Sequence, residues 1–438
     1  MLYNTLSAPI TCQIELTSAC NNSCIYCYNH WRHCNDTTQK SINSAMLEKI
    51  VDQVIDCQIF QVIFTGGECM LQKKTLFKGL ERLINHGVSC TVNSNLTNIN
   101  KEDCRTLYKI GVRGILTSVC SYNCDTHDWI SQRVGAFDET IRGIQISLDA
   151  GISVATSMVL VKQNIRDVIP TGIMLKGLGT RQFFATKASP PLNAKDFSKF
   201  MVNREEMVAS MEDLSILQMD YGMIVGILEC YSLCSYGTPE KFPFVAERRC
   251  SAGITTCTIG SDGNVRPCSH SDKVYGNVMI TGLISAWEAM VDQRDGRLLP
   301  KVCKSCPLFA DCSGGCRVDA FCCSGRYDTL DPYAQPKIVP KISSSDRPLR
   351  FISLANKLEV NRGLHTRKES VGVLCADETF MGTPAILTDD TFSLVTALAD
   401  RHFTVEEVSV ITELSVNDAT KLCSTLVRDK IFAVVQNH

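Results

Sequence analysis

The sequence predicts an α/β protein in which a partial (β/α)6 barrel precedes a cysteine-rich region and a small winged-helix-like C-terminal domain. Three observations lead to this fold class. Short apolar segments alternate with amphipathic ones from residue 11 to 187, cysteines are concentrated between residues 230 and 323, and the aperiodic segment QPKIVPKISSSDRP precedes a further compact pattern. Alternating strand and helix signals are typical of a parallel sheet covered by helices.

Six apolar segments of the first region are predicted strands: TCQIEL, QVIFTGG, VSCTVNSN, GILTSV, ISVATSMVL and RQFFATK. The segments between them, such as 46–57 and 138–150, repeat apolar residues at three- and four-residue steps and are predicted helices. Ligands bind at the carboxyl ends of the strands in such sheets. We therefore expect the polar and cysteine-bearing segments that follow the strands to converge on one face.

The chain is predicted to divide into five parts. These are a barrel core at 1–190, a mainly helical bridge at 191–249, a cysteine-dense domain at 250–335, a linker at 336–350 and a winged-helix-like domain at 351–438. In the last part, Thr404 with Glu407 and Ser415 with Asp418 predict the starts of two helices, because this spacing is typical of capping boxes.

Composition narrows the class of protein. The chain has 438 residues, of which 45% are hydrophobic, and its formal net charge is −2, which gives no bulk attraction to nucleic acid or to anionic membranes. We find no signal peptide and no apolar run of about 18 residues, and we expect a cytoplasmic protein. In a reducing compartment the 24 cysteines favour metal or cluster ligation over disulfides.

Cys20, Cys24 and Cys27 have the spacing C-x3-C-x2-C, and we expect them to be the catalytic centre as well as metal ligands. Three thiolates on one tight loop can bind three irons of a 4Fe-4S cubane and leave the fourth iron without a protein ligand. That iron can chelate the amino and carboxylate groups of S-adenosylmethionine, so that an electron from the cluster breaks the sulfur–carbon bond and yields a 5'-deoxyadenosyl radical. For the triplet alone, a zinc site or ordinary buried thiols are the alternatives.

The segment LTSACNNSCIYCYNH follows the first predicted strand and resembles the cysteine loop of the radical S-adenosylmethionine (radical SAM) superfamily. The resemblance implies an aromatic residue against the adenine, a glycine-glycine-glutamate element at the methionine amino group, and polar groups that hold the ribose and the carboxylate. The matching positions are Tyr26, Gly66, Gly67, Glu68, Asn93, Asn95, Ser118 and Arg133. Two residues depart from the family pattern, since Cys69 replaces a proline and Cys120 replaces an aspartate.

A second set of cysteines, Cys250-x12-Gly263-x4-Cys268 followed by Cys303-x2-Cys306-x5-Cys312-x3-Cys316, is similar to the SPASM domain of peptide-modifying radical enzymes. The resemblance implies two auxiliary 4Fe-4S clusters, and so three clusters in all. The inner one is expected on Cys250, Cys257, Cys268 and Cys316, and the outer one on Cys303, Cys306 and Cys312. We expect Cys323 as the fourth outer ligand, with Cys322 as the other candidate. A pair of zinc knuckles is the alternative.

Residues 358–432 resemble the small peptide-recognition domain of ribosomal peptide biosynthesis. Such domains capture a leader peptide as an added strand, and the expected edge is the strand from Val371 to Cys375. A plain winged-helix module for dimerisation or nucleic-acid binding is the alternative, although the near-neutral charge argues against nucleic acid.

The leading functional hypothesis is a maturase that abstracts hydrogen from a residue of a ribosomally made precursor peptide, giving a thioether, carbon–carbon or ether crosslink or an epimer. It would take electrons from a flavodoxin or ferredoxin. The alternatives are formylglycine formation in a sulfatase and a non-catalytic iron–sulfur electron carrier. Candidate hydrogen donors are Cys120, Cys124, Cys230 and Cys234, and candidate bases are His127, Asp128 and His270.

Overall fold

A computed structural model of the protein describes residues 3, 5–29, 31, 38–192, 194, 196–337, 352–354, 356–378 and 384–435. Residues 338–350 of the predicted linker lie outside this set. The chain forms two compact units, residues 1–342 and 343–438, which are described separately below. No helix among the described residues is long and apolar enough to span a lipid bilayer.

A ten-stranded sheet organises the first unit, with the order β10-β9-β8-β1-β2-β3-β4-β5-β6-β7. All six predicted strands form, and they lie parallel and in chain order. They are β1 (Thr11–Glu15), β2 (Gln61–Thr65), β3 (Ser89–Asn93), β4 (Gly114–Ser118), β5 (Ser153–Leu160) and β6 (Gln182–Lys187). The predicted α/β class with a parallel sheet is therefore confirmed, whereas the closure into a partial barrel stays a prediction.

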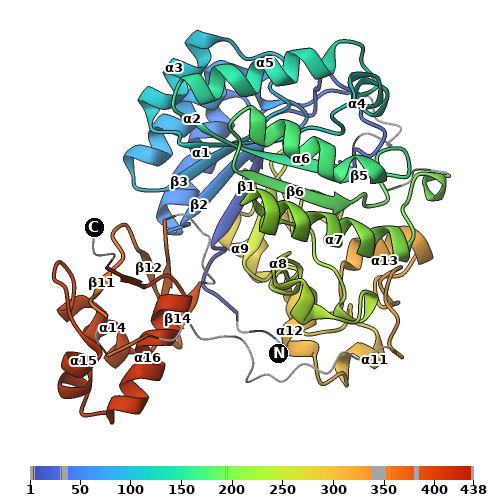
Figure 1. Cartoon of the computed structure of the whole chain (residues 1–438). Coiled ribbons are helices and arrows are strands. Elements are labelled where there is room, and N and C mark those ends of the chain that lie inside the picture. Colours follow the sequence, from blue (N-terminus) through green and yellow to red (C-terminus); the bar gives the residue numbers. More distant parts are fainter. Residues whose placement is uncertain are drawn as a thin grey trace. The chain divides into compact units, whose positions relative to one another are not determined.

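Helices connect the successive strands, as expected for strand–helix units (Figure 1). They are α1 (Ser44–Asp56), α2 (Lys73–Asn85), α3 (Lys101–Ile110), α4 (Cys124–Ser131), α5 (Ala136–Asp149), α6 (Val168–Gly177) and α7 (Arg204–Tyr221). The start and end of α3 illustrate why the helices begin and end at these residues. A capping box joins Asn100 to Asp103, and Gly111 ends the helix with a φ of 115° that favours glycine.

The region that follows α7 continues the same sheet. β7 (Ile224–Gly226) pairs with β6 inside the segment predicted to be mainly helical, and β8 (Thr256–Ile259) lies parallel to β1. β9 (Asn264–Arg266) and β10 (Gly276–Asn277) complete the sheet. The remaining elements are short helices: α8 (Pro243–Ala246), α9 (Leu283–Glu288), α10 (Val291–Arg294), α11 (Lys301–Lys304), α12 (Phe309–Cys312) and α13 (Arg317–Ser324).

The described residues of the second unit form a small antiparallel sheet, a strand pair and three helices. Its elements are β11 (Leu358–Val360), β12 (His365–Glu369), β13 (Gly372–Ala376), β14 (Ala385–Leu387), α14 (Asp389–Ala397), α15 (Val405–Thr412), α16 (Val416–Arg428) and β15 (Phe432–Val434). Both predicted helix starts are confirmed, because Thr404 and Ser415 accept hydrogen bonds from Glu407 N and Asp418 N. The winged-helix assignment stays a prediction.

The predicted edge strand at Val371–Cys375 is wrong. β13 is the central strand of its sheet, with Val373 opposite Lys368 of β12 on one side and opposite Leu387 of β14 on the other. All five residues of β13 are buried, which is typical of a strand with neighbours on both sides. The outer strands of this sheet are β12 and β14.

Candidate active site

The predicted cysteine loop begins beyond the carboxyl end of β1, as the sequence indicated. Burial raises the pKa of the Cys24 thiol well above its usual range, and the nearby thiols of Cys120, Cys27 and Cys20 raise it further. The three motif sulfurs therefore lie close together. Three closely spaced thiols on one loop fit a metal cluster, because iron binding relieves the cost of burying the thiolate form.

The Gly66-Gly67 pair packs against the chain that leads into this loop. Gly67 N donates to Thr17 O at 2.6 Å and Glu68 N donates to Ala19 O at 2.8 Å. A Cβ at Gly67 would lie 2.1 Å from Ala19 O, so only glycine allows this approach. Gly66 has a φ of +133°, and its carbonyl accepts from Asn29 Nδ2 at 3.0 Å. The pair thus fixes the start of the cysteine loop.

Glu68 is buried, and both of its carboxylate oxygens accept hydrogen bonds from the protein. Oε1 accepts from Ser94 Oγ at 2.7 Å and from Met70 N at 2.9 Å, and Oε2 accepts from Asn95 N at 2.7 Å. Burial raises the pKa of Glu68, and these hydrogen bonds oppose the rise. In this structure the side chain joins the end of β2 to the end of β3.

Asn95 connects that junction to the cysteine loop. Its Nδ2 donates to Asn21 Oδ1 at 2.8 Å and lies 4.0 Å from Cys20 Sγ, while Asn21 Nδ2 donates to Thr97 Oγ1 at 2.8 Å. Asn21 and Thr97 were not predicted, because spacing alone does not distinguish a loop asparagine with a partner from one in solvent. Asn93 contributes its carbonyl, which accepts from the Cys69 thiol at 3.3 Å.

Tyr26 lies against the residues that follow β4. Its hydroxyl is 3.6 Å from Cys120 Sγ; burial raises the pKa of this hydroxyl well above its usual range, and the side chain of Ser118 at the end of β4 opposes the rise. Behind Cys120, its backbone N–H donates to His127 Nδ1 at 3.2 Å, and burial lowers the pKa of His127 to about 4. His127 is therefore a neutral acceptor that holds this backbone.

Two other candidate residues, Asp128 and Arg133, have local partners. Asp128 accepts from Gly135 N and Phe137 N, which caps the start of α5, and Arg133 forms an ion pair with Glu139 at 2.5 Å. Cys124 is exposed at the start of α4. The structure does not bring these side chains to Tyr26, and their predicted roles stay predictions.

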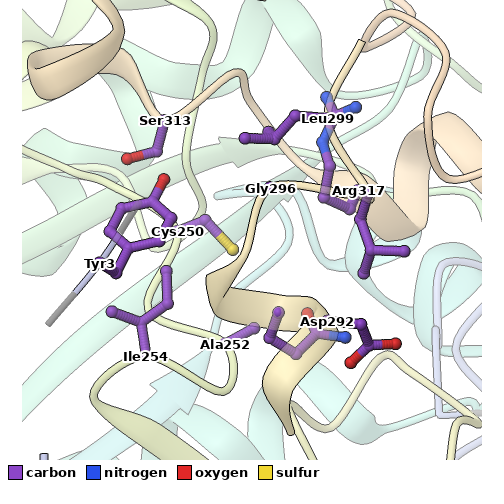
Figure 2. Close-up of a pocket in the computed structure, with 11 residues that line it drawn as sticks. Tyr3, Cys250, Ala252, Ile254, Asp292, Gly296, Leu299, Ser313 and Arg317 are labelled. Atoms are coloured by element: carbon purple, nitrogen blue, oxygen red, sulfur yellow. The ribbon is translucent and has the colours of Figure 1, made fainter. Parts of the chain in front are cut away.

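The first auxiliary group of thiols contains Cys250, Cys268 and Cys316, whose role as cluster ligands stays a prediction, together with Cys230. The Cys268 thiol interacts electrostatically with those of Cys316 and Cys250, and the Cys230 thiol interacts with the same two thiols. Figure 2 shows Cys250 at a small cavity with Tyr3, Ser313 and Arg317. Four sulfurs from distant parts of the chain thus meet here.

Arg317 and Asp331 fix the turn that carries Cys316. Arg317 Nη1 donates to Thr329 O at 2.7 Å and to Tyr327 O at 3.0 Å, and its Nη2 donates to Gly314 O. Asp331 Oδ2 accepts from Cys316 N at 3.0 Å. The turn is therefore preorganised on both sides of the sulfur.

The second auxiliary group lines a cavity of about 220 Å³. It contains the three predicted thiols and one that was not predicted for this place: Cys303, Cys306, Cys312 and Cys234. Burial raises the pKa of Cys303 to about 11, and the thiols of Cys312, Cys234 and Cys306 contribute to the rise. The residue before Cys234 also contacts the group, since Leu233 N donates to Cys312 Sγ at 3.3 Å.

The structure places three of the predicted cysteines elsewhere. Cys257 lies opposite Cys12 in the β1–β8 register, and their sulfurs are 3.8 Å apart in the buried sheet. Cys322 Sγ is 4.0 Å from His270 Nε2, and the electrostatic neighbours of Cys323 are Asp319 and Cys322 rather than the outer thiols. These contacts are with residues outside the two thiol groups, and the predicted role of the three cysteines as cluster ligands stays a prediction.

A buried network of charged groups lies at the carboxyl end of β6. Lys187 Nζ is 2.5 Å from Asp319 Oδ2 and 3.6 Å from Glu229 Oε2. His270 Nδ1 is 3.7 Å from Asp319 Oδ1, and its ring centroid is 5.1 Å from that of Tyr28, which follows Cys27. Sequence reasoning named His270 but missed Lys187, whose position as the last residue of a parallel strand was the available signal.

These observations define the class of protein. A parallel α/β sheet carries three clustered thiols on the loop after its first strand, and two further thiol groups follow, which is the donor set of an iron–sulfur enzyme. Residues 14–171 match the Radical SAM superfamily, and residues 250–307 match SPASM, an iron-sulfur cluster-binding domain. The chain therefore carries a radical SAM domain and a SPASM domain.

Several curated proteins are similar over three quarters of the chain. The PqqA peptide cyclase of Granulibacter bethesdensis is 22% identical over 75% of this chain and 88% of its own length. The mycofactocin maturase MftC of Mycolicibacterium smegmatis is 23% identical over 75% and 83%. The AdoMet-dependent heme synthase of Nitratidesulfovibrio vulgaris is 24% identical over 75% and 93%.

Solved structures confirm the fold. SuiB of Streptococcus suis bound to S-adenosylmethionine superposes with a TM-score of 0.61 at 18% identity, over 76% of this chain and 79% of that one. Native anSMEcpe with bound AdoMet also gives 0.61, at 17% identity over 75% and 95%. The radical SAM and SPASM domains imply 4Fe-4S clusters and S-adenosylmethionine as cofactors.

Proposed function

We propose that the protein is a peptide maturase that abstracts hydrogen from a residue of a ribosomally made precursor peptide and leaves a crosslink or an epimer. The observation that carries the proposal is the presence of three separate thiol groups in one unit, one of them on the loop after β1. Two of the similar proteins are by name a peptide cyclase and a mycofactocin maturase, which supports a peptide substrate.

Cys20, Cys24 and Cys27 hold the cluster that binds S-adenosylmethionine in this proposal. When the cluster and S-adenosylmethionine are bound and an electron arrives from a flavodoxin or ferredoxin, the cluster and the cosubstrate together supply a 5'-deoxyadenosyl radical that takes hydrogen from carbon. The chain positions the cosubstrate with the Tyr26 segment and with the backbone of Gly66-Gly67. The Glu68–Asn95 junction keeps these parts in register, because it joins two strand ends to the cysteine loop.

The second unit binds the leader segment of the peptide. β13 already has a strand on both sides, so we move the proposed docking edge to β14 (Ala385–Leu387). Among the described residues, β14 pairs with β13 alone, and Ala385 and Ile386 are only half-buried. An added peptide strand would gain backbone hydrogen bonds on that side.

Coexpression with a candidate precursor peptide, followed by mass spectrometry, tests the function. A crosslink lowers the peptide mass by about 2 Da, whereas epimerisation leaves the mass unchanged and takes up one deuterium from heavy water. Cys24→Ala is the matched control and should leave the peptide unmodified. The chain is also similar to an AdoMet-dependent heme synthase, so a porphyrin is the competing class of substrate. Consumption of S-adenosylmethionine that depends on an added porphyrin and not on any peptide would overturn the proposal.

Hydrogen exchange tests the docking edge separately. Added leader peptide should slow amide exchange in Ala385–Leu387, while the amides of β13 exchange slowly with and without peptide. Protection confined to other parts of the second unit would contradict the β14 edge without contradicting the maturase function.

A further inference from the structure

The segment from Cys230 to Cys234 lies between the two auxiliary thiol groups and contributes a sulfur to each. It follows β7, and its second half is the short helical turn at Leu233–Ser235. The segment is fixed to the sheet, because Tyr231 OH accepts from Lys187 N at 2.7 Å. A second contact joins Arg204 Nε to Ser235 O. Its two thiols therefore have defined positions before any metal binds.

Cys230 is at the inner group. The side chain is buried, with 5% of its surface exposed, and its thiol contacts those of Cys250 and Cys316. These three sulfurs come from segments 20 and 86 residues apart in sequence, counted from Cys230. With Cys268 they make a set of four, which is the number of thiolates that a fully protein-ligated 4Fe-4S cluster requires.

Cys234 is at the outer group and faces the same cavity as the three motif cysteines. Two of those, Cys303 and Cys312, belong to the short helices α11 and α12. The segment approaches them closely, as the 3.3 Å contact between Leu233 N and Cys312 Sγ shows. A backbone N–H that donates to a ligating sulfur is common around iron–sulfur clusters and tunes their potential.

We propose that the Cys230–Cys234 segment completes both auxiliary clusters. Cys230 is the fourth ligand of the cluster on Cys250, Cys268 and Cys316, and Cys234 is the fourth ligand of the cluster on Cys303, Cys306 and Cys312. This assignment of the two fourth ligands rests on the proposed function in one respect, since it requires that both auxiliary clusters exist. It has a direct consequence for the chemistry, since neither thiol is then available as a hydrogen donor for epimerisation.

Iron content of full-length variants tests the assignment. In a parent with Cys20, Cys24 and Cys27 all replaced by alanine, two complete auxiliary clusters correspond to about eight irons per chain. Adding Cys230→Ala or Cys234→Ala should each lower the iron and sulfide content, or change the electron paramagnetic resonance of the reduced cluster concerned. The matched controls Cys257→Ala and Cys323→Ala should leave iron, sulfide and resonance unchanged. The reverse pattern would overturn the proposal.

Alkylation of the unaltered holoprotein gives a second measurement that does not depend on how a variant folds. Cys234 should react with iodoacetamide only after the clusters are removed with a chelator, whereas the exposed Cys323 should react before and after. Equal labelling of Cys234 and Cys323 in the holoprotein would refute the outer ligand. A triple-alanine parent that binds no iron at all would instead refute the auxiliary clusters, and with them the proposed function.

Discussion

Replacing Gly67 by alanine tests whether the glycine pair positions the cysteine loop. The new Cβ would lie 2.1 Å from Ala19 O and 2.5 Å from Ala19 C, whereas real contacts of this kind are essentially never shorter than 3.0 Å. The chain before Cys20 would therefore have to move by about 0.9 Å, because both colliding atoms belong to the backbone and cannot rotate away. This movement displaces the entry to the cluster site.

The same shift breaks the hydrogen bonds from Gly67 N to Thr17 O and from Glu68 N to Ala19 O. At about 1 kcal/mol each, their loss costs roughly 2 kcal/mol, which is about a 30-fold change in an equilibrium constant. We expect Gly67→Ala to lower anaerobic formation of 5'-deoxyadenosine with dithionite at least tenfold. Gly114→Ala is the control, since its Cβ would meet nothing within 4 Å. Equal activity of Gly67→Ala and the control would refute the reasoning.

Replacing Cys24 by alanine should abolish 5'-deoxyadenosine formation, while Cys306→Ala should retain part of it; equal loss in both would contradict separate roles. Glu68→Gln should weaken S-adenosylmethionine binding about tenfold in equilibrium dialysis, because an amide N–H then faces Asn95 N. Unchanged affinity would argue against a role of the Glu68–Asn95 junction. The pKa of His127 is about 4 when folded and about 6.5 when unfolded, so the unfolded chain takes up a proton between these pH values. The free energy of unfolding should therefore fall by up to about 3 kcal/mol from pH 7 to pH 4. His127→Gln should lose this part of the pH dependence, measured by urea unfolding. If the free energies of unfolding of the two proteins changed in parallel with pH, this role of His127 would be contradicted.

The strands of the first unit were predictable because buried parallel strands are short, continuous apolar runs. All six expected runs became strands within one residue or two of the predicted limits. β7 was not predicted because its three residues are too few to show a periodic pattern of apolar side chains. The error at β13 has a different cause, since the order of strands in an antiparallel sheet depends on pairings that a single strand does not encode.

The candidate site was predictable where one loop supplies its residues and not where distant segments meet. The spacing of Cys20, Cys24 and Cys27 predicted a cluster once the resemblance of the surrounding segment was added to it. Cys257 fitted the expected number of ligands, but the register of β8 on β1 places it opposite Cys12. Cys230 was not predicted as a ligand, because its contact with the inner group depends on how the chain after β7 packs.

Charge explains why a cation is buried between the two auxiliary groups. A cluster turns neutral thiols into thiolates, and negative charge in a low-dielectric interior is costly unless a positive group lies nearby. Arg317 is 8% exposed and acts on both groups. Burial raises the pKa of Cys303 to about 11 while Arg317 opposes the rise, and contact with Cys230 lowers the pKa of Cys250 to about 7, with a further contribution from Arg317. One guanidinium, whose N–H groups also hold the turn that carries Cys316, thus favours the deprotonated form of one sulfur in each group, Cys303 and Cys250.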